Sequence, residues 1–208
     1  PKLDAIVLSH NHYDHTESDT LKFLAARDNP PVFLPLRVQP LVKNFGFDKI
    51  YELDWWQEVA LEKFKITCLP SKHFSGRSAT DRNQTLWTSM MISFNDPKKN
   101  VYFAGDTAYS PHFTEIAHEF SDIDLTLMPI GAYLPRWFMR EVHVSPDESI
   151  RAFEDLNAKK LLAIHWGTYD LGDEEWDQPK RDAITAAQIR RLDFARICIT
   201  DIGAVTLF

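Results

Sequence analysis

The chain has 208 residues, of which 44% are hydrophobic, and a formal net charge of -7. That length suffices for a sizeable core, so we expect residues 1–208 to form a single domain. The acidic balance argues against a nucleic-acid partner, because contacts to phosphate need an excess of Lys and Arg. No apolar run is long enough to span a membrane, and no signal peptide opens the chain. Cys68 and Cys198 lie in apolar stretches, which predicts buried free thiols in a reducing, cytoplasmic location.

Apolar strand patterns alternate with helical spacing, which predicts an α/β chain with helices covering a sheet. In the first half we expect strands over residues 3–9, 31–36, 49–54 and 58–71, and helices over 18–27 and 38–47. Ser18 or Asp19 is the expected N-cap of the first helix. Residues 71–85 are polar and predict a loop. In the second half we expect a hairpin of strands 86–94 and 100–106, strands at 124–130, 161–167, 195–200 and 203–208, and helices near 111–120, 145–156 and 180–192.

Three imidazoles and a carboxylate crowd into the stretch after the first predicted strand, which reads LSHNHYDH over residues 8–15. Alternate side chains of a strand face the same way, so His10 and His12 can point together from the end of this strand. Asp14 and His15 follow where the chain turns and can face a neighbouring point. This arrangement suits two adjacent metal ions better than one.

Further metal-ligand types recur just after predicted strands. His73 and His165 follow strands, and Asp106 follows a strand and a glycine, whose missing side chain lets the backbone come close. Neutral imidazoles suit zinc and similar metals, and a carboxylate can bridge two cations. The expected ligand sets are His10, His12 and His73 for one ion, and Asp14, His15 and His165 for the other, with Asp106 as the bridge.

This order of ligands resembles the metallo-β-lactamase fold superfamily. The surrounding segments, above all PIGAYLPRWFM and AIHWGT, are similar to N-acylphosphatidylethanolamine-hydrolysing phospholipase D and its bacterial relatives. The resemblance implies an αβ/βα sandwich with a dimetal site between two sheets. It also implies two zinc ions, or other divalent metals, and phosphodiester hydrolysis. Members normally carry several strands before the H-x-H-x-D-H strand, so we expect a domain that lacks its N-terminal strands.

Catalytic roles follow from this arrangement. Two cations that share a water would make hydroxide available for attack on phosphorus. We expect the carboxylates Asp14 and Asp106 to take part in catalysis by holding these cations. His143 precedes a predicted helix capped by Ser145. The resemblance gives this histidine a place near the reacting atoms, where it would orient or protonate the substrate.

Substrate contacts are predicted in the segment that precedes His143. Arg136 can pair with phosphate through two N–H bonds, with a solvated arginine as the alternative. Tyr133, Trp137 and Phe138 can line an apolar entrance, although aromatic side chains more often belong to the core. In the helix near 111–120, we expect His112 to be a surface or packing residue.

The substrate is expected to be a small molecule or a phospholipid. A phospholipid would bring peripheral membrane contact through an exposed apolar patch. Two alternatives stay open. The scaffold hosts many reactions, so a lactonase or carboxylic-ester hydrolase is the first. A metal-binding protein without turnover is the second.

Overall fold

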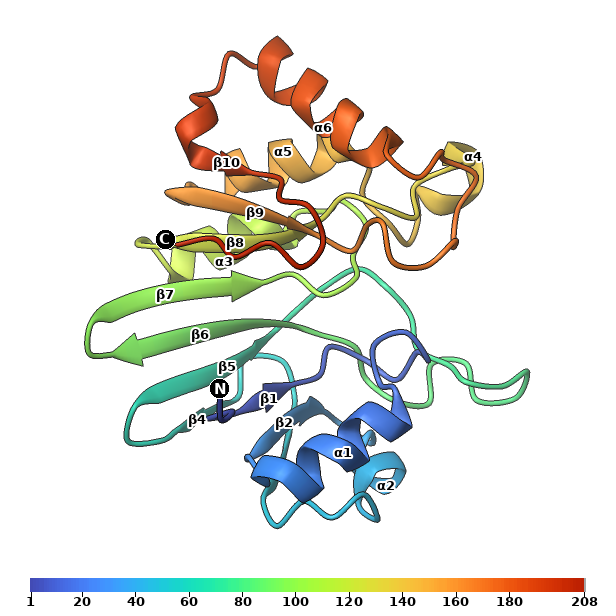
Figure 1. The fold of residues 1–208 in the computed structure, drawn as a ribbon, viewed down its shortest axis with the longest axis vertical. Coiled ribbons are helices and arrows are strands. Elements are labelled where there is room, and N and C mark those ends of the chain that lie inside the picture. The colour runs from blue at the N-terminus through green and yellow to red at the C-terminus, as the bar shows by residue number, and fades with distance from the viewer. Residues whose placement is uncertain (208) are drawn as a thin grey trace.

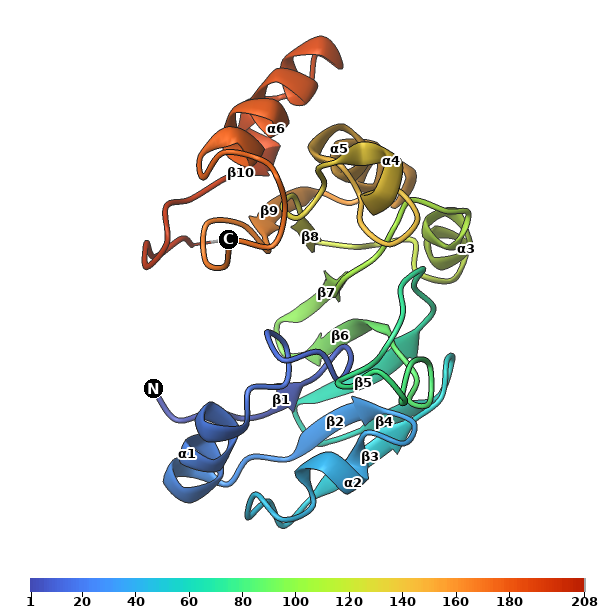
Figure 2. The same cartoon turned by 90° about the vertical axis from the view of Figure 1, so that its right-hand side faces the viewer.

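A computed structural model of the chain describes residues 1–207. These residues form two sheets with helices on their outer faces (Figures 1 and 2). The smaller sheet has the strand order β1-β2-β3, and the larger has the order β10-β9-β8-β7-β6-β5-β4. The predicted αβ/βα sandwich is therefore confirmed.

The elements follow the predicted order. The strands are β1 (Ile6–Val7), β2 (Val32–Pro35), β3 (Ile50–Leu53), β4 (Glu58–Ala60), β5 (Phe64–Leu69), β6 (Ser89–Asn95), β7 (Lys98–Phe103), β8 (Leu125–Pro129), β9 (Lys160–Ile164) and β10 (Ile197–Cys198). The α-helices are α1 (Ser18–Asp28), α2 (Gln39–Val42), α3 (His112–Glu119), α4 (Arg136–Met139), α5 (Pro146–Asp155) and α6 (Gln178–Ile189).

Three apolar clusters hold the layers together. Phe33 of the small sheet packs with Ile66 and Met90 of the large sheet, so the two sheets share one core. A second cluster joins the small sheet to α1 and α2, and a third joins β7, β8 and β9 to α3, α5 and α6. Each large side chain fully buried in this way stabilises the fold by about 1.5–3 kcal/mol.

The strand directions bring polar loops to one edge. β7, β8 and β9 pair in parallel, so the loops that follow them leave the large sheet at the same end. β1 belongs to the small sheet and points to the same side as β7 (Figure 1). The predicted ligands therefore come together although they are far apart in the sequence.

Two expectations about the first half of the chain are wrong. The N-cap of α1 is Glu17, whose carboxylate accepts hydrogen bonds from Asp19 N at 2.9 Å and Thr20 N at 2.6 Å. The single strand expected over 58–71 is two strands, β4 and β5. A turn separates them, in which Leu61 N donates to Phe64 O at 2.8 Å.

Three expectations about the second half also need correction. The short helix α4 is absent from the prediction, and residues 203–207 form no strand. Phe208, the last residue of that expected strand, lies outside the described residues. Cys68 and Cys198 are free as expected, but only Cys68 is buried, and burial raises the pKa of its thiol to about 12.

Within residues 1–207, no helix is both long and apolar enough to cross a bilayer.

Candidate metal centre

The motif after β1 folds into a tight turn over residues 10–16. The carbonyl oxygen of His12 accepts hydrogen bonds from His15 N at 3.2 Å and Thr16 N at 2.8 Å. The Thr16 hydroxyl donates to the His10 carbonyl oxygen at 2.7 Å. This turn brings two pairs of ligand types close together on one short segment.

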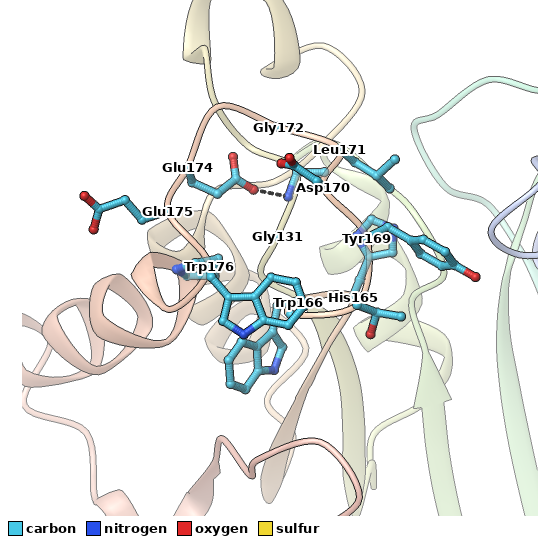
Figure 3. A pocket seen from close by; sticks show the side chains of 14 residues that line it. Gly131, His165, Trp166, Tyr169, Asp170, Leu171, Gly172, Glu174, Glu175 and Trp176 are labelled. Carbon is cyan, nitrogen blue, oxygen red and sulfur yellow. Dashed lines mark hydrogen bonds between the residues drawn. The ribbon is translucent and has the colours of Figure 1, made fainter.

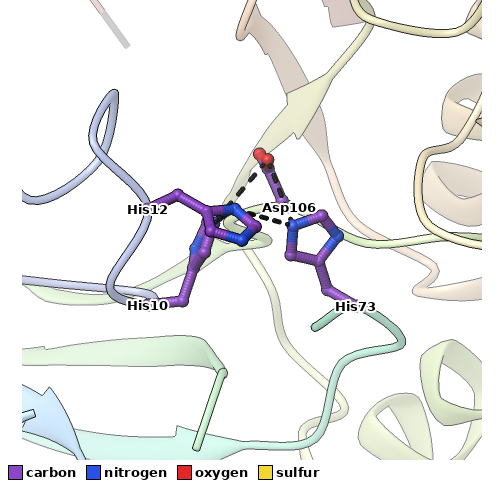
Figure 4. Close-up of side chains that lie close together, drawn as sticks. All are labelled: His10, His12, His73 and Asp106. Atoms are coloured by element: carbon purple, nitrogen blue, oxygen red, sulfur yellow. Dashed lines mark hydrogen bonds and ion pairs between the residues drawn. The ribbon is translucent and has the colours of Figure 1, made fainter. Parts of the chain in front are cut away.

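The first predicted ligand set converges on one point. One ligand atom from each of His10, His12, His73 and Asp106 lies within 4.8 Å of the others, and the rings face the carboxylate (Figure 4). His10 Nε2 lies 2.8 Å from His12 Nδ1, which in turn lies 3.4 Å from His73 Nε2. Ring nitrogens of several histidines that point at each other suit a shared cation better than mutual hydrogen bonding.

The second predicted set shares Asp106 with the first. Asp14, His15 and His165 each offer a ligand atom within 4.8 Å of an Asp106 oxygen. His15 Nε2 lies 3.2 Å from an oxygen of both Asp14 and Asp106, and His165 Nε2 lies 3.3 Å from the other Asp106 oxygen. The structure thus brings all seven predicted ligands together, with Asp106 between the two sets.

Outer contacts fix which ring nitrogen faces the centre. The Ser9 hydroxyl lies 3.0 Å from His10 Nδ1 and 3.4 Å from His15 Nδ1. His73 Nδ1 donates to the Val142 carbonyl oxygen at 2.8 Å, which leaves its Nε2 free for a metal. Ser9 adjoins the motif, but the sequence pattern did not single it out.

Buried atoms without partners at the centre call for a cation. Burial acts to raise the pKa of Asp106, but His165 and His15 outweigh it and hold that pKa well below its usual range. Burial acts to lower the pKa of His15, but Asp106 and Asp14 raise it to about 10. His15 Nε2, Asp106 Oδ1 and both His165 ring nitrogens are buried without a hydrogen-bond partner. Divalent cations would satisfy these atoms, so the donor set fits a two-metal centre.

Two glycines permit the close backbone approach on which this geometry depends. Gly105 has a φ of +59°, and a Cβ there would lie 2.6 Å from Ser9 Cβ. A Cβ on Gly131, after β8, would lie 2.2 Å from the His165 carbonyl oxygen. His165 itself has a φ of 57°, a costly conformation for a non-glycine residue that is typical of functional sites.

Comparison with known families agrees with this centre. The sequence profile described as the beta-lactamase superfamily domain matches residues 1–166. The chain belongs to this superfamily. A metallo hydrolase of this fold from the archaeon Ignicoccus hospitalis superposes with a TM-score of 0.71 at 19% identity, over 98% of this chain and 78% of the other.

Curated relatives in the superfamily match most of the chain. An uncharacterized protein of Mycobacterium tuberculosis is 39% identical over 193 residues, which are 90% of this chain and 50% of that protein. The N-acyl-phosphatidylethanolamine-hydrolyzing phospholipase D 1 of Caenorhabditis elegans is 34% identical over 100% of this chain and 59% of that enzyme. The mitochondrial N-acyl-phosphatidylethanolamine-hydrolyzing phospholipase D of Saccharomyces cerevisiae is 34% identical over 86% of this chain and 40% of its own length. The chain thus spans about half the length of the curated relatives that it matches.

His143 lies beside the ligands of the superfamily centre without belonging to either set. Its Nδ1 is buried without a hydrogen-bond partner, 3.9 Å from Asp106 Oδ2. Its ring stacks on His165, with centroids 5.7 Å apart. Burial lowers its pKa, so the neutral ring is favoured and can present one N–H toward the centre. The catalytic role of His143 stays a prediction.

Arg136 contacts protein groups. Its guanidinium donates to the His143 carbonyl oxygen at 2.8 Å and to the carboxylate of Glu148, which also belongs to the capping box of α5. These contacts hold the segment of His143 against α5 and leave fewer of the guanidinium N–H groups for a phosphate. Binding of phosphate by Arg136 stays a prediction.

The predicted aromatic residues divide into two environments. Tyr133 is buried, and its hydroxyl donates to Asp182 at 2.5 Å, so it packs inside the fold. Trp137 and Phe138, on α4, are 79% and 60% exposed. Of the three predicted aromatic residues, only these two present apolar surface to solvent, and their contact with substrate stays a prediction.

A cavity of about 460 Å³ adjoins His165. Trp166 and Trp176 lie on one side of it, and Asp170 and Glu174 lie on the other (Figure 3). The Glu174 carboxylate accepts backbone hydrogen bonds from residues 132–134, at 2.5, 3.3 and 3.0 Å, and so ties two loops together. No sequence pattern indicates this link, because the partners of Glu174 are main-chain groups about 40 residues away.

Proposed function

We propose that this chain forms the hydrolytic core of a two-zinc phosphodiesterase that acts on N-acylphosphatidylethanolamine-type phospholipids. The observation that carries the proposal is the carboxylate Asp106 shared by two ligand sets, with the unpartnered His143 beside them. The names of the worm and yeast relatives supply the substrate class.

The ligand sets would hold the two cations, and other residues would bind and orient the substrate. When bound, such cations would lower the pKa of a water molecule and offset the charge of the phosphoryl group. Asp14 and Asp106 remain ionised, because neighbouring histidines lower the pKa of both. His143 would donate a hydrogen bond from its ring N–H to a phosphoryl oxygen or to the departing oxygen. The Arg136 guanidinium donates a hydrogen bond to the His143 carbonyl oxygen and so holds the backbone of His143 in place. Arg136 would affect the reaction through His143.

The rest of the substrate needs apolar surface. The cavity beside His165 would receive one arm of the diester against Trp166 and Trp176. The exposed side chains of Trp137 and Phe138 would enter the membrane interface, where amphipathic and aromatic side chains are favoured. We therefore expect peripheral membrane contact through α4. Flotation with phosphatidylcholine vesicles tests this contact, and a Trp137→Ala, Phe138→Ala variant that floats as well as wild type contradicts it.

A second candidate is hydrolysis of a lactone or carboxylic ester on the same scaffold. The observation that favours it is the pairing of Arg136 with Glu148, because a phosphodiesterase gains from a free cationic side chain. The third hypothesis is a metal-binding protein without catalytic activity. Turnover of any of the substrates named below would exclude it.

One assay separates these functions. The zinc-loaded full-length protein is offered bis(p-nitrophenyl) phosphate, an N-acylated phosphatidylethanolamine in mixed micelles, and a lactone. We expect hydrolysis of both phosphodiesters, and hydrolysis of the lactone alone would overturn the proposal. Asp106→Asn should abolish turnover and weaken zinc uptake at both sites, whereas His143→Gln should lower kcat about 10²–10⁴-fold with zinc uptake unchanged.

A further inference from the structure

Arg77 links the ligand turn to a second loop. Its Nη1 donates to the carbonyl oxygens of Asn11 at 2.9 Å and Thr16 at 3.0 Å, and it lies 3.5 Å from that of His12. These carbonyl groups belong to the turn that carries four ligands. The carbonyl oxygens of Asn11 and Thr16 lie outside regular secondary structure and depend on such a partner for hydrogen bonding, whereas that of His12 also accepts from His15 N and Thr16 N within the turn.

The loop that presents Arg77 is braced on both sides. The Asp81 carboxylate accepts hydrogen bonds from the backbone N–H of Arg77, at 2.9 and 3.0 Å. The Asn11 side chain accepts one from Gly76 N at 2.8 Å. The Tyr13 hydroxyl donates to the Arg77 carbonyl oxygen at 3.1 Å, and the guanidinium lies 3.8 Å from the centre of the Tyr13 ring. Because the same loop begins just after His73, Arg77 joins the two segments that supply the histidines of the first ligand set.

We propose that Arg77 is a positioning residue for the metal centre: it clamps turn 10–16 onto the loop of His73 and holds the ligands at the spacing that two cations need. A metal site works only when its ligands are held within about 0.5 Å of the productive geometry. The planar guanidinium suits this task, because the two N–H bonds of its Nη1 have fixed directions. The proposal rests on the metal-binding part of the proposed function and is independent of the substrate.

The charge of Arg77, taken alone, predicts the opposite change in metal affinity. A fixed guanidinium repels divalent cations, so loss of its charge alone would tighten metal binding. Loss of a clamp would weaken it. Arg82 offers a matched control, because it lies on the same loop, over the Phe74 ring at 4.3 Å, and its charge acts on His12. Among the described residues, its side chain donates no hydrogen bond to turn 10–16.

The experiment measures zinc affinity of the full-length protein by competition with a chromophoric chelator. Arg77→Met should weaken affinity about 10–100-fold, the usual cost of losing an outer partner of a metal site. Arg77→Lys, which keeps the charge but replaces the planar group with a rotatable ammonium, should also weaken it. Arg82→Met should leave affinity unchanged or tighten it. Zinc affinity of Arg77→Met equal to or tighter than wild type would overturn the proposal, as would equal weakening by Arg82→Met.

Hydrogen exchange of the metal-free protein supplies a readout that does not depend on zinc or on activity. In Arg77→Met, the amides of His15 and Thr16 should exchange at least tenfold faster, with α5 unchanged as a check of folding. Exchange at wild-type rates refutes the clamp even if the variant binds zinc weakly. If wild type takes up no zinc, the proposed function fails, and the exchange result still decides the role of Arg77. If Arg77→Met does not fold, Arg77→Lys decides both measurements.

Discussion

Substitution of Gly131 by alanine is the sharpest steric test of the metal centre. The added Cβ would lie 2.2 Å from the His165 carbonyl oxygen and 3.2 Å from Trp166 Cα. Both are main-chain atoms, so no flexible side chain can move aside. Real Cβ atoms essentially never approach below 3.0 Å, so the segment of His165 must shift by roughly 1 Å.

Such a shift acts on both stability and chemistry. Overpacking of this kind costs about 1–3 kcal/mol of unfolding free energy. A displacement of about 1 Å in a reacting group can cost about 10²-fold in rate. Because His165 belongs to the second ligand set only, we expect Gly131→Ala to keep one zinc ion and to lose the other.

Elemental analysis after dialysis at fixed free zinc measures the metal content, and thermal unfolding measures the stability. Gly203→Ala is the control for metal content, since no atom lies within 4 Å of the added methyl group; its φ of +82° carries a backbone cost of its own, so the unfolding free energies of the two variants are not compared. If Gly131→Ala binds two zinc ions with wild-type affinity, the contact between the two loops does not position His165.

Two further predictions concern groups outside the centre. Burial lowers the pKa of His112 to about 4, so protonation favours the unfolded chain, where the pKa is about 6.5. The contribution of His112 is complete above pH 6.5 and is lost as the pH falls toward 4, by up to about 3 kcal/mol. Unfolding free energies of wild type and His112→Asn, measured from pH 4 to 7, should therefore converge at low pH, and parallel curves would refute this. Ser145→Ala should cost about 1 kcal/mol, because Ser145 caps α5 reciprocally with Glu148, whereas Ser145→Thr should fold like wild type; equal stability of all three proteins would contradict the capping role.

The ligands were predictable because each one follows a strand with a strong local pattern. His10 and His12 follow from strand alternation, and Asp106 from the strand and glycine before it. The contacts around the ligands leave no such pattern. Arg77 acts through carbonyl oxygens and Glu174 through backbone N–H groups, which every residue type carries. A sequence therefore shows the ligands of a centre before it shows what positions them.

The wrong predictions about the fold also come from contacts that leave no clear pattern in the sequence. Glu17 caps α1 although glutamate is a weak N-cap, because its carboxylate reaches two backbone N–H groups. The alternation in residues 58–71 shifts its phase at the consecutive polar residues Glu62 and Lys63, but the turn between β4 and β5 has no glycine or proline to mark it. Arg136 has its partner Glu148 on the helix that follows His143, and only the packed structure brings the two together.

The charge of the centre decides how an anionic substrate can bind. In the metal-free protein the ionised Asp14 and Asp106 face the site, and the cationic ring of His15 is already paired with both, its Nε2 lying 3.2 Å from an oxygen of each. A phosphodiester would therefore meet two carboxylates and a histidine that they engage. Arg77 and Arg136 are already engaged by carbonyl and carboxylate groups. We therefore expect the metals to be required for substrate binding as well as for turnover. Calorimetric titration with a non-hydrolysable phosphodiester should detect binding only after zinc is added. Equal affinity without zinc would mean that the phosphate sits on cationic side chains away from the two ligand sets.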